Sequence, residues 1–246
     1  MPIYGLIGKK LSHSFSKKFF TEKFQKEGLQ DYRYELFELS EIGEVDELLK
    51  KGQLKGFNIT IPYKKEIIPY LSHLDSSAKK VGAVNVVKIV EGQMHGYNSD
   101  YYGFKTSLEN WLPAGQSFKA LVLGTGGASK AVIATLNDMN ICHTMVSRKK
   151  QAHTVTYDEL TEDLIKNHRL IINTTPLGMS PDVESCPAIK YAALDTNHFL
   201  YDLVYNPTTT TFLDKGKKKG AFVKNGLEML HLQADKSWEI WNKRIA

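Results

Sequence analysis

Short apolar runs alternate with amphipathic stretches along the first hundred residues. Phe19, Phe20 and Phe24 recur at helical spacing, whereas the neighbouring apolar runs are short and bounded by polar turns. We expect strands over residues 3–7, 32–39 and 56–61, with helices over 17–27 and 41–51. This alternation predicts a parallel sheet with helical crossovers. Two further runs, residues 83–90 and 93–97, flank Glu91-Gly92 and predict a hairpin that closes this half.

The second half of the chain repeats the alternation. A helix over residues 102–111 ends before Pro113, and Ala114-Gly115 precedes a new strand. The expected strands are residues 118–123, 141–146, 170–173 and 199–203, and the expected helix after the first of them is 126–139. A final helix has one face too apolar to stand alone, so it needs a surface to cover. That face comprises Leu227, Leu230, Ala234, Trp238 and Trp241.

Length and composition limit the class of protein. The chain has 246 residues, of which 42% are apolar and 24% charged, as in ordinary globular proteins, and this argues against disorder and coiled coil. Cys142 and Cys186 are too few for a disulfide framework or a zinc site, and the histidines show no metal-binding spacing, so we expect no metal. We expect a cytoplasmic protein without a membrane span. The net charge of +5 suits nucleic acid, but equally a phosphorylated cofactor or an acidic metabolite.

A glycine-rich turn carries the clearest chemical signal. Residues 121–130 run from a buried strand through Gly124, Gly126 and Gly127 into a helix. Glycines let the backbone approach phosphates, and the helix N-terminus presents free amides and the positive end of its dipole. Ser129 occupies the place of the third glycine. The pattern predicts a dinucleotide site, and the alternative is a plain tight turn.

The end of the next strand indicates which dinucleotide is bound. Binders of NAD place an acidic residue there, on the ribose hydroxyl. This chain has Ser147-Arg148-Lys149-Lys150 instead, and the Arg148 guanidinium can hold a 2′-phosphate with two hydrogen bonds. We therefore expect NADP as the cofactor. The alternative is a solvent-exposed basic loop that binds no ligand.

The polar motifs resemble one family in order and spacing, the shikimate dehydrogenase family. The matching segments span almost the whole chain: residues 11–16, 56–64, 82–85, 96–100, the glycine loop, 173–179, 201–207 and 225–233. The resemblance implies an α/β fold of two α/β domains, an N-terminal substrate-binding domain and a Rossmann-like NADP-binding domain, with a cleft between them. We expect residues 1–100 plus 221–246 to form the first domain and 101–220 the second.

The resemblance also implies the site. Lys64 and Asp100 are the catalytic pair, with Lys64 donating to the developing alkoxide and Asp100 orienting Lys64 and bonding a substrate hydroxyl. Taken alone, such residues are more often solvated, or polar groups in turns and at strand ends. The implied substrate ligands are Ser14, Ser16, Asn58, Thr60, Asn85, Tyr205 and Gln233. The implied cofactor ligands are Gly124, Thr125, Gly126, Gly127, Ala128, Ser147, Arg148, Lys149, Thr174, Thr175, Pro176, Leu203 and Gly226.

The chain departs from the family pattern at a few positions. Lys17 stands where a proline is usual, and Tyr101 stands where a glycine usually follows the aspartate. The tyrosine ring either narrows the site or covers it. Thr125 replaces a smaller residue in the glycine loop, Ser147 replaces an asparagine, and Thr211 replaces a proline.

We therefore expect an oxidoreductase that acts on a CH-OH group, reversibly reducing 3-dehydroshikimate to shikimate with NADPH in chorismate and aromatic amino-acid biosynthesis. Its partners are a small-molecule substrate and the cofactor, with no nucleic acid or membrane, in a monomer or homodimer. The alternatives are a quinate/shikimate dehydrogenase of the same superfamily, with NAD as an alternative cofactor, and the methylenetetrahydrofolate dehydrogenase group, which lacks the paired serines. A non-catalytic NADP sensor and a basic nucleic-acid binder are alternatives from other classes.

Overall fold

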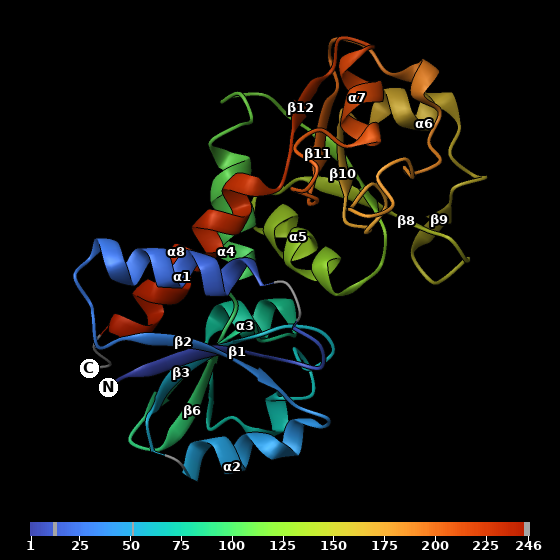
Figure 1. The fold of residues 1–246 in the computed structure, drawn as a ribbon. Helices are drawn as coiled ribbons and strands as arrows, with labels where there is room; N and C mark the ends of the chain where they lie inside the picture. The colour runs from blue at the N-terminus through green and yellow to red at the C-terminus, as the bar shows by residue number, and fades with distance from the viewer. Residues whose placement is uncertain (12–13, 51, 244–246) are drawn as a thin grey trace. The chain divides into compact units, whose positions relative to one another are not determined.

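The computed structural model describes residues 1–11, 14–50 and 52–243, which form two compact units (Figure 1). The first unit comprises residues 1–102 and 233–246, and the second comprises residues 103–232. Ser12 and His13 of the serine-rich segment, and Lys51 at the end of an expected helix, lie outside the described residues. Each unit contains its own six-stranded sheet.

The sheet of the first unit is mixed. Its strands, in the spatial order β2-β1-β3-β5-β6-β4, are β1 (Ile3–Gly8), β2 (Arg33–Glu38), β3 (Leu54–Ile59), β4 (His73–Leu74), β5 (Val86–Val90) and β6 (Gln93–Tyr97). Strand β1 pairs in parallel with β2 and β3, as the alternation predicted. Strands β5 and β6 form the expected hairpin, and β5 runs antiparallel to β3. The parallel run from β2 to β3 is therefore followed by two antiparallel pairs, because a hairpin rather than a crossover helix supplies the next strands, and β4 then pairs in parallel with β6 at the far edge.

Two of the three helices that lie wholly in the first unit begin at recognisable caps. The three helices are α1 (Phe15–Lys26), α2 (Val45–Lys50) and α3 (Ser76–Val81), with 3-10 turns at Ile42–Glu44 and Ile68–Tyr70. Ser14 accepts a hydrogen bond from the Lys17 N–H at the start of α1, and Asp75 does the same for Ser77 at the start of α3. Such caps satisfy amide groups that the helix itself leaves without a partner.

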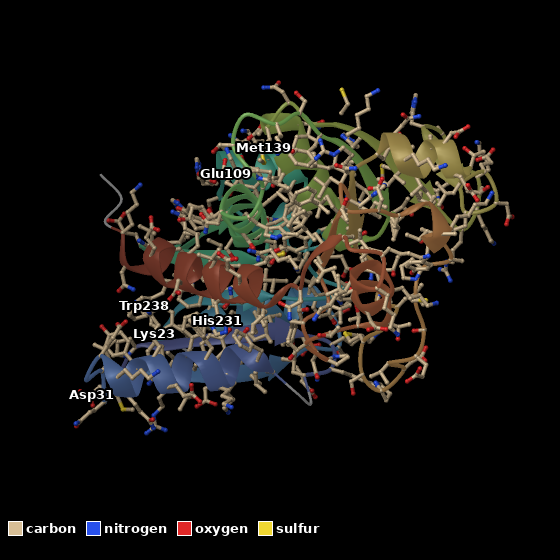
Figure 2. The ribbon with its side chains drawn as sticks, turned by 90° about the horizontal axis from the view of Figure 1, so that it is seen from above. Lys23, Asp31, Glu109, Met139, His231 and Trp238 are labelled. Carbon is tan, nitrogen blue, oxygen red and sulfur yellow. The ribbon has the colours of Figure 1, made fainter. Side chains whose placement is uncertain are left out.

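Helix α8 (Leu227–Asn242) provides aromatic side chains to the first unit. Figure 2 shows α1 and α8 side by side, with Lys23 and Trp238 between them. The Trp238 ring contacts Phe24, and Lys23 forms an ion pair with Asp235 at 3.0 Å. Trp241 is buried and donates from Nε1 to Val87 O at 2.9 Å. The expected surface is therefore present for the later part of this face, where Ala234 and Trp241 are buried, whereas Leu227 at the start of the helix is 41% exposed.

The sheet of the second unit is entirely parallel. Its strands, in the order β12-β11-β10-β7-β8-β9, are β7 (Lys119–Leu123), β8 (Cys142–Ser147), β9 (Thr154–Thr156), β10 (Leu170–Asn173), β11 (Phe199–Asp202) and β12 (Phe222–Lys224). The central strands read as continuous apolar runs because both of their faces are buried. The helices are α4 (Ser99–Glu109), α5 (Gly127–Asp138), α6 (Glu162–Asn167) and α7 (Thr211–Lys217), with a 3-10 turn at Tyr191–Ala193.

Residues 221–232 lie in the second unit rather than the first, to which the sequence assigned them. Strand β12 pairs in parallel with β11, and this pairing holds the segment to the second sheet. Two helices are divided between the units. Residues 99–102 of α4 belong to the first unit and the rest of α4 to the second, whereas residues 227–232 of α8 belong to the second unit and the rest of α8 to the first.

Within the described ranges, no helix is both long enough and apolar enough to span a lipid bilayer.

Candidate active site

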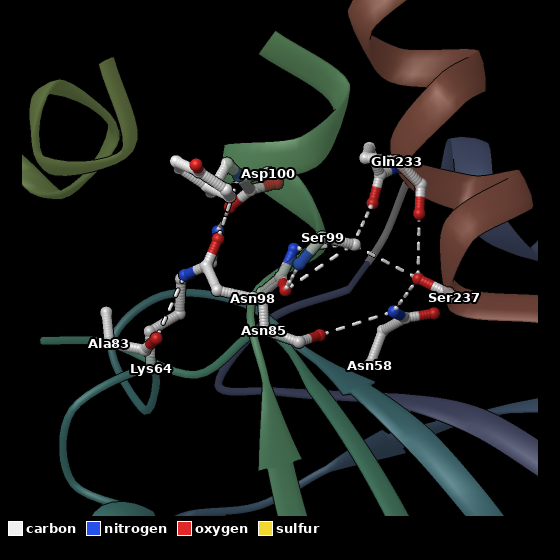
Figure 3. A network of polar contacts seen from close by, with 10 residues as sticks. Asn58, Lys64, Ala83, Asn85, Asn98, Ser99, Asp100, Gln233 and Ser237 are labelled. Atoms are coloured by element: carbon white, nitrogen blue, oxygen red, sulfur yellow. Dashed lines mark hydrogen bonds and ion pairs between the residues drawn. The ribbon is translucent and has the colours of Figure 1, made fainter. Parts of the chain in front are cut away.

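Lys64 and Asp100 form an ion pair in the first unit. Lys64 Nζ lies 2.6 Å from Asp100 Oδ2, and the two side chains are 29% and 22% exposed. Lys64 belongs to the turn after β3, and Asp100 is the second residue of α4 (Figure 3). Free amides in the first turn of a helix stabilise a carboxylate. A lysine that is partly withdrawn from water and held by a carboxylate has the chemistry of a proton donor.

A network of buried polar side chains lies beside this pair. The Ser99 N–H donates to Asn85 Oδ1 at 2.7 Å, and Asn85 Nδ2 donates to Ser99 Oγ at 3.1 Å. Ser99 Oγ also lies 3.3 Å from Gln233 Oε1 and 3.2 Å from Ser237 Oγ (Figure 3). The network brings Asn85 and Gln233, both expected ligands, close together. Ser99 and Ser237 were missed, although Ser237 stands one helical turn after Gln233 in the sequence.

Asn58 uses its amide inside the protein. Its Oδ1 accepts from Tyr34 Oη at 2.8 Å, and its Nδ2 donates to Asn85 O at 3.2 Å and to Ser237 Oγ at 3.0 Å. Both amide hydrogens are therefore committed, and the side chain is 6% exposed. The expected contact of Asn58 with a substrate hydroxyl stays a prediction, and it would use the second lone pair of Oδ1, because neither amide hydrogen remains. Tyr34, which sequence reasoning missed, is the buried partner that sets the orientation of this amide.

The paired serines both lie at the start of α1. Ser14 Oγ accepts from the Lys17 N–H at 3.2 Å, which leaves its hydroxyl hydrogen to donate elsewhere. A proline at position 17 would lack this N–H, so the departure at Lys17 adds a cap. Ser16 hydrogen-bonds the buried Tyr34 hydroxyl, whose pKa is raised chiefly by burial. Thr60, the remaining expected ligand of this unit, is partly exposed directly after β3.

Tyr101 was expected either to narrow the site or to cover it, and its ring does not lie between Lys64 and Asp100. The 2.6 Å ion pair leaves no space for a ring between them. The Tyr101 ring instead lies beneath Lys80 of α3, with Nζ 5.6 Å from the ring centroid. It lines a cavity of about 550 Å³ together with Asp75 and Tyr97.

In the second unit, the glycine loop joins β7 to α5, and no protein side chain among the described residues fills the space next to the start of α5. Gly124 has a φ of +106°, and an added Cβ would lie 2.9 Å from Thr174 Oγ1, so only glycine fits there. A Cβ added at Gly126 or Gly127 would meet no protein atom within 4 Å. No acidic residue lies in the first turn of α5. These residues therefore fit a phosphate of a dinucleotide, next to Thr125 and Ala128.

The basic loop after β8 presents its cations to solvent. Ser147 is buried at the strand end, whereas Arg148, Lys149 and Lys150 are exposed. Lys150 Nζ lies 2.7 Å from Glu159 Oε1, so its charge is already paired. Arg148 and Lys149 are thus the better candidates for a phosphate.

The loop after β10 is fixed by a buried carboxylate. Asp202 Oδ1 accepts from Asn173 Nδ2 at 2.9 Å, and Asp202 Oδ2 accepts from Thr210 Oγ1 at 2.6 Å. Asn173 Oδ1 in turn accepts from the N–H and the hydroxyl of Thr175, which precedes Pro176. Thr174 Oγ1 donates to Leu123 O at 2.8 Å. Burial raises the pKa of Asp202 to about 6. Sequence reasoning did not select this residue as functional.

The remaining expected ligands also belong to the second unit. The Gly226 N–H donates to Val204 O at 3.2 Å, and an added Cβ would collide with Leu203 O. Gly226 is therefore required for the close approach of two backbone segments. Tyr205 is 38% exposed. Among residues 1–11, 14–50 and 52–243 there is no group of three or more His, Cys, Asp or Glu side chains that could hold a metal.

The fold and these residues define a class of two-domain α/β proteins in which a Rossmann-like domain accompanies a separate α/β domain. The family model for the shikimate dehydrogenase substrate-binding domain matches residues 6–87. The chain is 41% identical to shikimate dehydrogenase (NADP(+)) from Clostridium beijerinckii, over 99% of this chain and 93% of the relative. The chain belongs to the shikimate dehydrogenase family.

Solved structures agree with this assignment. Shikimate dehydrogenase from Aquifex aeolicus superimposes with a TM-score of 0.88 and 34% identity, covering 98% of this chain and 92% of that one. Shikimate 5-dehydrogenase from Thermus thermophilus, solved in complex with NADP(H) and shikimate, superimposes with a TM-score of 0.85 and 28% identity, covering 98% and 94%. The expected two-domain α/β fold is confirmed.

Proposed function

We propose that this protein catalyses the reversible reduction of 3-dehydroshikimate to shikimate with NADPH. The observation that carries the proposal is the Lys64–Asp100 ion pair at 2.6 Å, in a unit whose sequence matches the substrate-binding domain of the family. Curated relatives of similar length carry the name shikimate dehydrogenase (NADP(+)).

Reduction of a ketone requires a hydride at carbon and a proton at oxygen. NADPH would supply the hydride when bound to the glycine loop and the basic loop. The Lys64 ammonium donates its proton to the developing alkoxide, which yields the hydroxyl of shikimate. Asp100 holds the lysine in place and accepts a hydrogen bond from a substrate hydroxyl. In the reverse direction Lys64 takes the proton back.

The remaining groups divide between the two ligands. Thr60, Asn85 and Gln233 are uncharged donors and acceptors, which suit the hydroxyls of the ring. Ser14 and Ser16 donate to the carboxylate, with Tyr205 as a further contact. Asn58 supports the orientation of Asn85 and Ser237 through its internal hydrogen bonds.

Replacing Ser14 by alanine should raise KM for 3-dehydroshikimate about tenfold and leave kcat within about twofold, because one hydrogen bond to a carboxylate contributes about 1.5 kcal/mol. Steady-state kinetics at saturating NADPH measures this. Thr21→Ala is the matched control, because that hydroxyl lies on the same helix and donates to Lys17 O. An unchanged KM in Ser14→Ala would remove Ser14 from the carboxylate site.

Replacing Arg148 by alanine should reduce the preference for NADPH over NADH about tenfold, since an exposed guanidinium loses part of its strength to solvent. The ratio of kcat/KM for the two cofactors measures the change. Lys150→Ala should keep the wild-type ratio, because that lysine is paired with Glu159. Equal losses in both variants would indicate a general effect of charge rather than recognition of the 2′-phosphate.

The decisive experiment follows NADPH oxidation by absorbance with 3-dehydroshikimate. NADH and 3-dehydroquinate serve as parallel controls for the cofactor and the substrate. Turnover that favours NADPH and 3-dehydroshikimate supports the proposal, and equal turnover of 3-dehydroquinate would favour a quinate/shikimate dehydrogenase. Tight NADPH binding without turnover of either substrate would favour a sensor.

Cys142 and Cys186 form no disulfide bond, which supports the cytoplasm as the proposed location.

A further inference from the structure

Asn98, the residue before α4, joins three segments of the first unit. It is 2% exposed, and its backbone N–H donates to Ser77 Oγ at 3.0 Å. Its Nδ2 donates to Ala83 O at 2.9 Å, and its Oδ1 accepts from the Tyr101 N–H at 3.0 Å (Figure 3). One side chain therefore ties the start of α4 to the segment before β5.

Both ends of this link lead to the ion pair. On one side, the Tyr101 N–H belongs to the first helical turn, which also carries Asp100. On the other side, Ala83 is followed by Val84, whose N–H donates to Lys64 O at 2.7 Å. The backbones of Lys64 and Asp100 are thus connected through the Asn98 side chain by a short series of hydrogen bonds.

The Lys64–Asp100 ion pair needs further hydrogen bonds to hold its two side chains in place. Lysine carries its charge on four rotatable carbons, and a pair that is 29% and 22% exposed gains little from attraction alone. Asparagine suits the task because one amide offers both an acceptor for Tyr101 and a donor for Ala83. Aspartate could cap the helix in the same way, but its carboxylate would face the Ala83 carbonyl without a proton to share.

We propose that Asn98 is a positioning residue for the Lys64–Asp100 pair, which rests on the function proposed above. It fixes the start of α4 against residues 83–84 and thereby keeps Lys64 Nζ and Asp100 Oδ2 in contact. It does not touch the substrate itself. Loss of the link displaces the proton donor, and misplacement of a catalytic group by about 1 Å can cost about 10²-fold in rate.

Two variants separate the helix cap from the link. Asn98→Ser keeps an oxygen able to cap α4 but lacks a donor that reaches Ala83 O, whereas Asn98→Ala removes both. Both should lower kcat by about 10- to 100-fold, with KM for NADPH and 3-dehydroshikimate within about twofold of wild type. Thermal unfolding should show Asn98→Ser to be the more stable of the two. Asn110→Ala is the matched control, because Asn110 follows the other end of α4 and bonds Glu228. It should keep the wild-type kcat.

A double-mutant cycle with Lys64→Ala gives the stricter test. If Asn98 acts through the lysine, Asn98→Ala should lower kcat by less than about threefold in the Lys64→Ala background. A full 10- to 100-fold further loss there, or a wild-type kcat in Asn98→Ser, would overturn the positioning role. The proposed function fails separately, if the wild-type protein does not reduce 3-dehydroshikimate with NADPH.

Discussion

Lys64→Ala is expected to lower kcat for 3-dehydroshikimate reduction by about 10²- to 10⁴-fold, the usual contribution of a positioned proton donor. In the variant, water has to protonate the alkoxide, without the fixed geometry that the 2.6 Å contact with Asp100 provides. Affinity for NADPH should change by less than about threefold, because the glycine loop and the basic loop are expected to hold the cofactor. Steady-state turnover and a fluorescence titration with NADPH measure the two quantities.

The neighbouring lysine supplies the control. Lys65 is exposed and follows Lys64 directly, so Lys65→Ala removes the same charge from the same turn. It should keep kcat within about twofold of wild type. A Lys64→Ala variant that retained more than about a tenth of the wild-type kcat would exclude Lys64 as the proton donor.

Asp202→Asn is expected to change how the stability of the second unit depends on pH. Burial raises the pKa of Asp202 from 3.8 to about 6, so the folded protein holds this proton more tightly than the unfolded chain. The stabilising contribution is complete below pH 4 and is lost as pH rises through about 6. A difference of about two pH units corresponds to up to about 3 kcal/mol in the free energy of unfolding. Asparagine can retain the contacts without ionising, with its NH₂ facing Thr210.

Urea unfolding of both proteins between pH 4 and 7 measures this effect. The stability of Asp202→Asn relative to wild type should increase by up to about 3 kcal/mol across that range. Asp163→Asn, at an exposed carboxylate of α6 in the same unit, controls for the loss of one negative charge. A relative stability that is constant with pH would show that Asp202 is ionised equally in the folded and unfolded states.

The longer strands and helices could be predicted because their hydrophobic patterns extend over enough residues to be recognised. The buried strands of the second sheet, the hairpin around Glu91-Gly92 and the glycine loop all lie within a few residues of their expected positions. The short helices α3, α6 and α7 were missed, since six or seven residues hardly show a helical period. Helix α2 is equally short, but the 3-10 turn before it extends its apolar pattern to Ile42. Their caps, Asp75 and Thr161 among them, were the available signal.

The site was less accessible to sequence reasoning. Lys64 and Asp100 are 36 positions apart, and only the family resemblance brought them together. Helix α4 begins at Ser99 rather than at residue 102, because the Asn98 side chain caps it and so places Asp100 in its first turn. The internal use of Asn58 depends on Tyr34 and Ser237, which are distant in sequence. No spacing rule could have joined these three residues.

The return of the chain to the first unit affects the order in which the two units are completed during synthesis. The second unit is one continuous segment, residues 103–232, and its strands are all available once that segment has been made. The first unit waits for Trp238 and Trp241 of α8, which pack against Tyr4 and Phe24. Until those residues emerge from the ribosome, the aromatic side chains of β1 and α1, which are made earlier, stay uncovered and open to chaperones or to misassembly. The half that is begun first is therefore the half that is finished last.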